Sequence, residues 1–211
     1  MTEERQFRLR VTYGKSGRLA MLSHLEVTHA LERMVRRARL PFALSNGFSP
    51  HMKMAFGSAL PVGVGGDEEI FDLTLRDYVA PAKALQALRD AAPVEMMPVS
   101  AEYIEPSAKA ASVACPFSVY EVTFDTPVSS IDWPSEIEVV RKKKPKTLVV
   151  GDYLVGDPEV SGNRVRFQLQ SKDTGSLRPD VFVRSLSAMG EGSQAPNATS
   201  ITRVAQSEAR I

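Results

Sequence analysis

The stretch RLAMLSHLEVTHALERMVRRARL, residues 18 to 40, decides the first half of the fold. Its apolar side chains recur at helical spacing along one stripe, and Arg33, Arg36 and Arg37 lie on the opposite face. The stripe comprises Val27, Leu31, Met34, Val35 and Ala38. We therefore predict an amphipathic helix with one apolar face packed on a sheet. The arginines are more typical of a solvated helix face, and a binding strip is the alternative.

The start of this helix carries a recognisable signal. Ser23 and Glu26 stand as Ser-x-x-Glu, a capping-box pattern that predicts a helix beginning near His24. Helix N-termini also attract anions, so Arg18 and His24 are candidates to hold a phosphate there. The alternative is that the cap already satisfies those backbone groups and His24 is merely exposed.

Strands and a second helix surround this helix in the sequence. Alternating apolar residues predict strands, and a proline followed by apolar residues at helical spacing predicts the helix. The predicted strands are QFRLRVTY (6–13), PFALS (41–45), EIFDLTL (69–75) and MPVSAEYIE (97–105), and the predicted helix is PAKALQALRDA (81–91). The order is β-α-β-β-α-β, with GVGG (63–66) in a loop before a strand.

The second half reads as a degraded copy of the first. FSVYEVTF, RVRFQLQ and ITRVAQ predict strands and RPDVFVRSLSAM predicts a helix, whereas SSIDWPSEIEVV is typical of either a short helix or strand. The small-residue, proline-bounded segment PSAKAASVACP separates the halves. We predict an α+β fold of tandem ferredoxin-like β-α-β-β-α-β halves with antiparallel sheets, spanning residues 1–106 and 117–211. The rival is one mixed α/β domain.

Composition limits the function classes. The chain is 43% hydrophobic and 24% charged, has a net charge of +1, and lacks an apolar run long enough to span a bilayer. Its first residues lack the apolar stretch of a secretory signal, and its one cysteine, Cys115, is compatible with a reducing compartment, so a cytoplasmic location is expected. One thiolate cannot hold an iron–sulfur cluster, and the histidines show no metal-ligand spacing, so we expect neither cofactor nor metal in this chain.

The segment SNGFSPHMK, residues 45 to 53, combines residue types that suit RNA. Its glycine permits a turn, Phe48 offers a ring face for a base, His51 can stack or donate, and Lys53 can meet phosphate. The plainer alternative is that Phe48 fills the core and His51 is a loop residue.

A basic run, RKKKPK at residues 141 to 146, is most simply a hairpin or loop. It is a candidate phosphate contact, a non-specific interaction arm, or a contact to an acidic partner. The side chains expected to contact RNA or another anion are Arg18, His24, Asn46, Phe48, His51, Lys53, Arg141, Lys142, Lys143, Lys144, Lys146 and Arg178.

The segment from Arg18 to Glu26, the SNGFSPHMK motif and ALPVGV resemble an uncharacterised bacterial family of radical-SAM-linked proteins. RKKKPK, SLRP at 176–179 and the late ITR resemble further landmarks of that family. The resemblance implies a partner: family members occur fused to, or encoded beside, a radical S-adenosylmethionine protein, often near RNA-processing genes. The iron–sulfur cluster and S-adenosylmethionine would then belong to that partner.

The expected function is a non-catalytic RNA-binding or substrate-presenting partner of a radical SAM enzyme in tRNA or rRNA modification or ribosome-linked RNA metabolism. Two alternatives remain open: a metal-independent endoribonuclease using His24 and His51, and a pure protein-interaction module. The RNA-binding reading requires the helix entry near residue 20 and the turn near residue 50 to form one cationic pocket.

Overall fold

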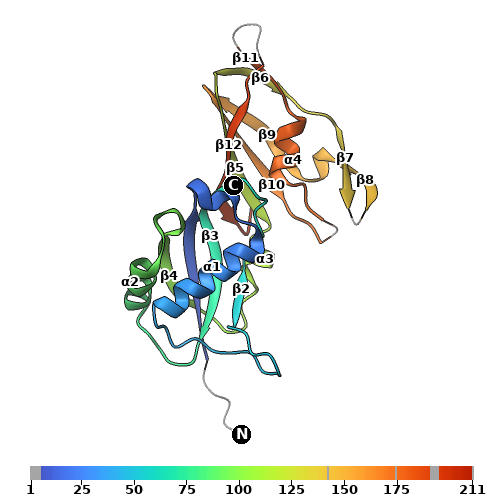
Figure 1. The fold of residues 1–211 in the computed structure, drawn as a ribbon. Coiled ribbons are helices and arrows are strands. Elements are labelled where there is room, and N and C mark those ends of the chain that lie inside the picture. The colour runs from blue at the N-terminus through green and yellow to red at the C-terminus, as the bar shows by residue number, and fades with distance from the viewer. Residues whose placement is uncertain (1–5, 142, 174, 191–194, 211) are drawn as a thin grey trace. The chain divides into compact units, whose positions relative to one another are not determined.

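The computed structural model describes residues 6–141, 143–173, 175–190 and 195–210, and it is a mixed α+β fold dominated by antiparallel strands. The chain divides into two compact units (Figure 1). Unit 1 is Met1–Val62 with Gly66–Ala114, and unit 2 is Gly63–Gly65 with Cys115–Ile211. No helix among the described residues is long and apolar enough to cross a membrane.

Unit 1 follows the order β1-α1-β2-β3-α2-β4. Its elements are β1 (Phe7–Lys15), η1 (Gly17–Met21), α1 (His24–Arg37), β2 (Met54–Phe56), β3 (Val64–Leu75), α2 (Pro81–Ala91), η2 (Val94–Met96), β4 (Pro98–Ile104) and α3 (Ala111–Ala114). The strands lie in the order β4-β1-β3-β2, and every adjacent pair is antiparallel.

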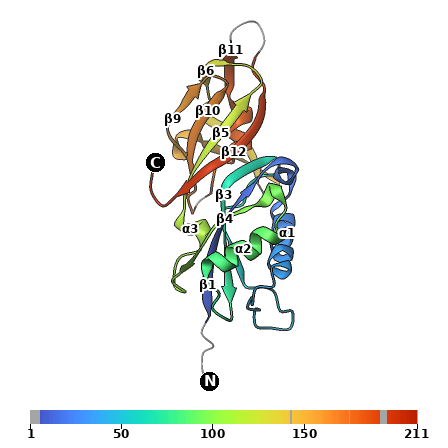
Figure 2. The same ribbon diagram turned by 90° about the vertical axis from the view of Figure 1, so that its left-hand side faces the viewer.

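The core of unit 1 lies between the sheet and helices α1 and α2. Odd-numbered residues of β1 and β3 point to this face, because side chains alternate along a strand. Leu9, Val11 and Phe71 pack there against the predicted apolar stripe of α1 and against Ala84 and Leu88 of α2. The even-numbered residues point to the opposite face, and Figure 2 shows α3 on that side of the sheet, away from α1.

Two predictions for unit 1 are wrong in detail. PFALS is not a strand: Phe42 and Leu44 make only isolated bridges, and the strand that pairs with β3 is Met54–Phe56. GVGG does not precede a strand, since β3 begins at Val64. The predicted helices are confirmed, with the capping box of Ser23 and Glu26 at the start of α1 and proline in the first turn of α2.

Unit 2 contains a four-stranded antiparallel sheet and two short ribbons. Its elements are β5 (Phe117–Phe124), β6 (Val128–Asp132), β7 (Glu136–Arg141), β8 (Lys144–Val149), η3 (Val150–Asp152), β9 (Leu154–Ser161), β10 (Arg164–Gln170), α4 (Pro179–Ser185), β11 (Ser187–Gly190) and β12 (Ala198–Ser207). The sheet order is β12-β5-β10-β9, and the ribbons are β11-β6 and β7-β8.

Helix α4 packs on the sheet of unit 2 through an aromatic cluster. The rings of Phe182 and Phe167 lie 4.9 Å apart, and Tyr120 stacks on Phe167 from the neighbouring strand at 5.6 Å. The ambiguous segment SSIDWPSEIEVV forms strands β6 and β7, as its β-branched residues favour, so this part of unit 2 does not repeat the first helix of unit 1.

Candidate nucleic-acid interface

Residues 44–52 form an arm at one end of unit 1. Leu44 and Met52 make an antiparallel bridge, and the Ser45 amide donates to the His51 carbonyl at 2.8 Å. The His51 amide donates to Ser45 Oγ at 3.0 Å. Gly47 turns the chain at φ +129°, a conformation that side chains rarely adopt. The arm is therefore held at its base by the backbone and turned by glycine at its tip.

Phe48 is the most exposed large apolar side chain described, at 110% relative exposure. The prediction that it could fill the core is excluded, because its ring lies entirely in solvent. Asn46 and His51 on the same arm are also exposed. The arm thus presents an aromatic face and polar groups to any ligand that approaches this end of unit 1.

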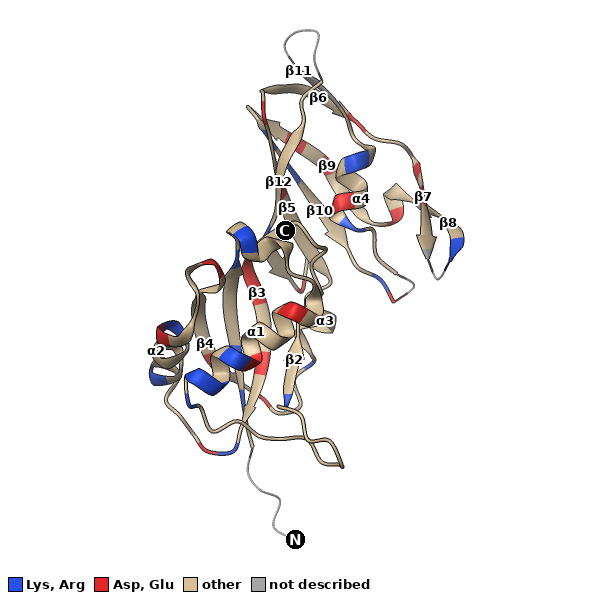
Figure 3. Ribbon diagram, in the orientation of Figure 1, with Lys and Arg blue, Asp and Glu red and all other residues tan. Residues whose placement is uncertain are grey.

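Four arginines lie at the C-terminal end of α1 and directly after it. We call Arg33, Arg36, Arg37 and Arg39 the α1 arginines, and all four are exposed. With the part of the chain that the structure describes, none of them makes an ion pair. Figure 3 shows the basic residues at this end of the helix. Their guanidinium groups are therefore not held in ion pairs by the described carboxylates, although Asp90 lines the same groove as Arg37.

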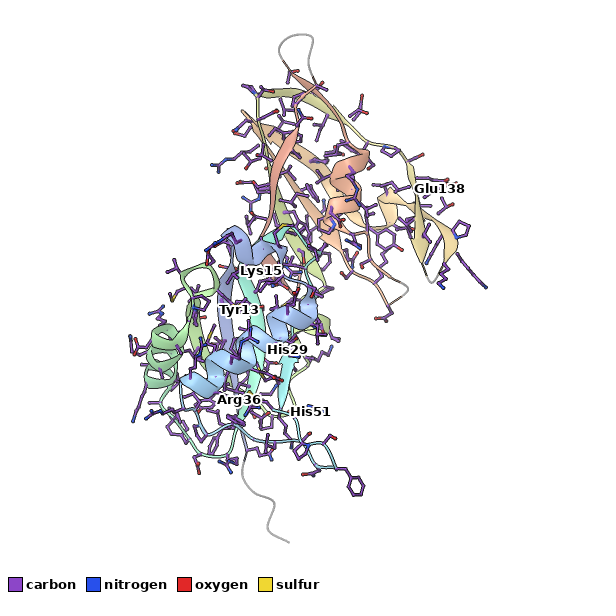
Figure 4. The ribbon with its side chains drawn as sticks, viewed as in Figure 1. Tyr13, Lys15, His29, Arg36, His51 and Glu138 are labelled. Atoms are coloured by element: carbon purple, nitrogen blue, oxygen red, sulfur yellow. The ribbon has the colours of Figure 1, made fainter. Side chains whose placement is uncertain are left out.

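The α1 arginines are linked to the arm through Phe42. The Arg36 guanidinium lies over the Phe42 ring, 5.0 Å from its centroid. The next residue, Ala43, accepts a backbone hydrogen bond from Lys53 at 2.9 Å, immediately beyond the arm. Figure 4 shows Arg36 and His51 at the same end of unit 1. We call the arm together with the α1 arginines the arm interface.

Lys53 points into a groove on the opposite face of the sheet from α1. This groove has a volume of about 470 Å³ and is lined by Gln6, Arg8, Ser45, Lys53, Asp72 and Pro106 among others. The Lys53 ammonium donates to Gln6 Oε1 at 3.2 Å. Because the Gln6 side chain is neutral, this hydrogen bond does not neutralise the charge of Lys53.

Arg8, which lines that groove, and Arg10 beside it are already held in ion pairs. Arg8 and Arg10 both bind the carboxylate of Asp72, at 2.7 and 2.8 Å, and Asp72 is 2% exposed. Arg8 also donates to the backbone carbonyls of Pro106 and Ala108, which ties the segment before α3 to the sheet. These two arginines hold the fold together and are poorly placed to bind a ligand.

The other predicted anion site lies at the far end of unit 1. Arg18 is 95% exposed and lies 3.8 Å from Glu95. The His24 ring packs edge-on against Phe56, with centroids 5.5 Å apart. His51 precedes Phe56 by five residues of extended chain, so roughly 16 Å of backbone, at about 3.3 Å per residue, separates His51 from the residue that His24 contacts. The structure does not bring the two histidines into one pocket.

Beside His24, a small buried cavity contains charged groups that the sequence did not indicate. Lys15 is 2% exposed and donates to the Leu22 carbonyl at 3.1 Å, which fixes the chain as it enters α1. Glu69 is also buried, and its carboxylate lies over Gly66, where an added Cβ would clash with it. The cavity volume is about 20 Å³, room for about one water molecule and not for a substrate.

Hydrogen bonds at the start of α1 lower the pKa of the Glu26 carboxylate. The Ser23 hydroxyl and the Ser23 amide both donate to Glu26 Oε2, at 2.7 and 2.8 Å. These bonds lower the pKa of Glu26 below its ordinary value of 4.5, the hydroxyl having the larger effect. Glu26 therefore acts as a cap.

The remaining predicted residues belong to unit 2. Lys143, Lys144 and Lys146 are exposed on the β7–β8 ribbon, whereas Lys142 and the side chain of Arg141 lie outside the described residues. Arg178 is bound by both carboxylate oxygens of Asp180, at 2.9 and 3.0 Å. Among the side chains that the structure describes, no three of His, Cys, Asp or Glu gather to hold a metal ion.

The α1 arginines are exposed, as the sequence-based interpretation of a solvated helix face predicts, and the alternative of a binding strip stays a prediction. The run RMVRRAR is visible in the sequence, but whether its arginines are held in ion pairs by the described carboxylates is a property of the folded chain. A family model described as "Uncharacterized protein conserved in bacteria (DUF2344)" matches residues 8–179. A search of curated proteins finds no match.

Proposed function

The chain belongs to the DUF2344 family of uncharacterized proteins conserved in bacteria, and from that premise we propose that unit 1 binds single-stranded RNA through the arm interface. The observation that carries the proposal is the fully exposed Phe48 ring on an arm linked to arginines without carboxylate partners. Exposed aromatics that stack on bases, beside cations that meet phosphates, are the usual means of binding single strands.

The charges of the arm interface support binding to a polyanion. Guanidinium groups pair with phosphate oxygens in a bidentate manner, and an arginine without a carboxylate partner has no ion pair to give up first. Lys53, next to the arm, adds a further cation. For single strands the logarithm of affinity falls by about 0.7 per phosphate contact for each unit of log salt.

The placement of Phe48 favours single strands over duplexes. A ring at the tip of an arm can stack only on a base whose face is free, and paired bases inside a helix are already stacked. Asn46 and His51 lie on the same arm and supply groups for hydrogen bonds to a base edge. The proposed ligand is therefore an unpaired segment, such as a loop or a single-stranded end.

The proposed role is non-catalytic. Acid–base cleavage by a histidine pair requires both rings to reach one phosphate group, and the separation of His24 from His51 does not provide that. Lys15 and Glu69 border a cavity too small for a nucleotide.

We extend the proposal to a radical SAM enzyme as partner, acting in tRNA or rRNA modification or ribosome-linked RNA metabolism. It is motivated by the resemblance of SNGFSPHMK and the neighbouring segments to radical-SAM-linked proteins. The iron–sulfur cluster and S-adenosylmethionine would be supplied by the partner, since this chain contains the one thiol of Cys115, which is buried.

The proposal includes a ferredoxin-like description of unit 1. Its support is the element order β-α-β-β-α-β together with the strand order β4-β1-β3-β2. Unit 2 shares an antiparallel sheet with a helix on one face, but its two ribbons depart from that pattern.

Fluorescence anisotropy with a labelled single-stranded RNA tests the proposed function. At about 50 mM salt, where phosphate contacts contribute strongly, the full chain should bind the single strand and bind the matching duplex more weakly. Arg33→Gln with Arg37→Gln should weaken binding. Arg164→Gln is the matched control, because Arg164 is exposed but already paired with Glu121 at 3.1 Å. Equal losses from both changes, or no binding by the wild type, would refute the proposal.

A further inference from the structure

A groove in unit 2 runs along one edge of strand β7. It has a volume of about 490 Å³ and lies between β7 and helix α4. Four consecutive residues of the strand, Ile137 to Val140, line it. Successive side chains of a strand point to opposite faces, so a groove touched by all four reaches the strand's edge as well as the ribbon face that bears Ile137 and Leu148. Figure 1 shows β7 beside α4.

The facing edge of β7 is available for main-chain pairing. Within the described residues β7 pairs only with β8, so its other edge bears backbone groups without a strand partner. The outer edge of β8 differs, because Lys144, Pro145 and Lys146 place a proline between two lysines there. Proline and lysine block the addition of a strand, whereas β7 contains neither among its side chains that line the groove. The β7–β8 ribbon is therefore protected against strand addition at the β8 edge and open to it at the β7 edge.

The floor of the groove is apolar. Ile137 and Leu148 are buried at its base, and Val139 and Val181 are half-buried along it. Val140 remains 76% exposed. Ile137 and Val139 point to one face of β7 and Val140 to the other, so an extended segment laid against this edge would cover Val139 with the side chains of one face and Val140 with those of the other.

The α4 rim of the groove carries excess positive charge. Arg178 and Arg184 both bind the carboxylate of Asp180, and the Arg184 contact is 3.1 Å. Arg178 binds both oxygens of Asp180, whereas Arg184 contacts only one of them and is 69% exposed, so the remaining N–H groups of Arg184 can attract a further acidic group. Glu138 lies on the strand side, labelled in Figure 4, so the favourable position for a carboxylate is toward α4.

We propose that this groove docks an extended segment of a partner protein, which adds a strand to the β7 edge, covers the apolar floor at Val139 with the side chains of one face, and places an acidic side chain against Arg184. Main-chain pairing supplies affinity in this mode, and the arginine rim supplies the preference for an acidic partner. This site is in unit 2 and does not depend on the RNA-binding proposal for unit 1.

The test uses the full chain and a fluorescein-labelled peptide that alternates valine with threonine and glutamate. A second peptide with lysine in place of glutamate is the charge control. Only the acidic peptide should bind with measurable affinity, and backbone amide shifts in NMR spectra should concentrate in β7 and α4.

Substitutions at two exposed residues should change the affinity for the acidic peptide differently. Arg184→Glu should weaken binding of the acidic peptide by about tenfold or more, which corresponds to about 1.4 kcal/mol. Glu138→Lys should leave the affinity unchanged or raise it, and circular dichroism confirms that both variants are folded. Equal binding of both peptides, shifts located elsewhere, or shifts in β7 and α4 caused by single-stranded RNA would overturn the proposal.

Discussion

Unit 1 contains two groups of arginines whose surroundings differ. Arg8 and Arg10 lie on the sheet, share the buried carboxylate of Asp72, and donate to backbone carbonyls of the segment before α3. The α1 arginines lie on a helix surface, and among the described residues they have no carboxylate partner. The first group stabilises the fold, and the second is available to a ligand. The same residue type therefore has two roles that its partners decide.

Removal of Asp72 should give the largest effect on stability. Asp72→Ala leaves two partly buried guanidinium groups without their anion, and loss of one partner of a buried ion pair costs about 3 to 5 kcal/mol. Urea unfolding of the full chain measures this loss in the free energy of unfolding. The control is Asp90→Ala, an exposed helix position bonded to Gln86, with an expected change within about 0.5 kcal/mol.

The RNA affinity of Asp72→Ala further tests the difference between the two groups of arginines. Arg8 and Arg10 would be released from their carboxylate, so binding should stay equal or increase at temperatures where the variant is folded. A loss of RNA affinity in the folded variant would show that the Asp72 site contributes to the interface, contrary to our account.

Phe48→Ala should reduce RNA affinity with no loss of stability. Stacking on one aromatic side chain is worth about 1 to 3 kcal/mol per base, and the fully exposed ring contributes no burial to the fold. Anisotropy titration measures the affinity and thermal melting the stability. Val94→Ala, an exposed apolar change in η2 outside the arm interface, serves as control and should bind normally.

Arg36 is intermediate between the two groups, because it contacts Phe42 but has no carboxylate. Arg36→Gln should cost about 0.5 to 1 kcal/mol of stability through loss of this cation–π contact. Arg33→Gln, on the same helix without such a contact, should leave stability nearly unchanged. Equal unfolding midpoints for both variants would contradict the assignment.

The capping box at the start of α1 predicts a small dependence of stability on pH. The hydrogen bonds from Ser23 lower the pKa of Glu26, so its contribution to stability is present above the ordinary value of 4.5 and is lost as pH falls through the lowered folded pKa. The stability difference between wild type and Glu26→Gln should therefore disappear in that acidic window. In a Ser23→Ala background the pH dependence should be smaller, because the hydroxyl bond is lost while the backbone amide of residue 23 still donates to Glu26; an unchanged dependence would show that another group causes it.

Local patterns predicted most of the fold. The apolar stripe and capping box gave α1, proline in the first turn gave α2, and alternation gave β1, β4, β5 and β10, because each depends on residues close together in sequence. Strand β2 was misplaced, since PFALS has the stronger strand composition whereas MAF has the pairing with β3. Which of the two segments pairs with β3 depends on tertiary contacts, and the local sequence does not indicate it.

The candidate site was predicted only in part. The exposed aromatic arm could be read from SNGFSPHMK, and the extended chain between His51 and Phe56 explains why His24 does not join it. Whether an arginine is paired depends on residues distant in sequence, as Asp72 is from Arg8 and Arg10. Sequence spacing therefore could not distinguish the occupied arginines from the available ones.

The most direct test is the salt dependence of single-stranded RNA affinity for the wild type and for the combined Arg33→Gln, Arg36→Gln and Arg37→Gln variant. If each of these arginines meets a phosphate, the slope of log affinity against log salt should become shallower by about 2, at about 0.7 per contact. An unchanged slope, with the variant folded, would contradict the claim that the α1 arginines bind RNA.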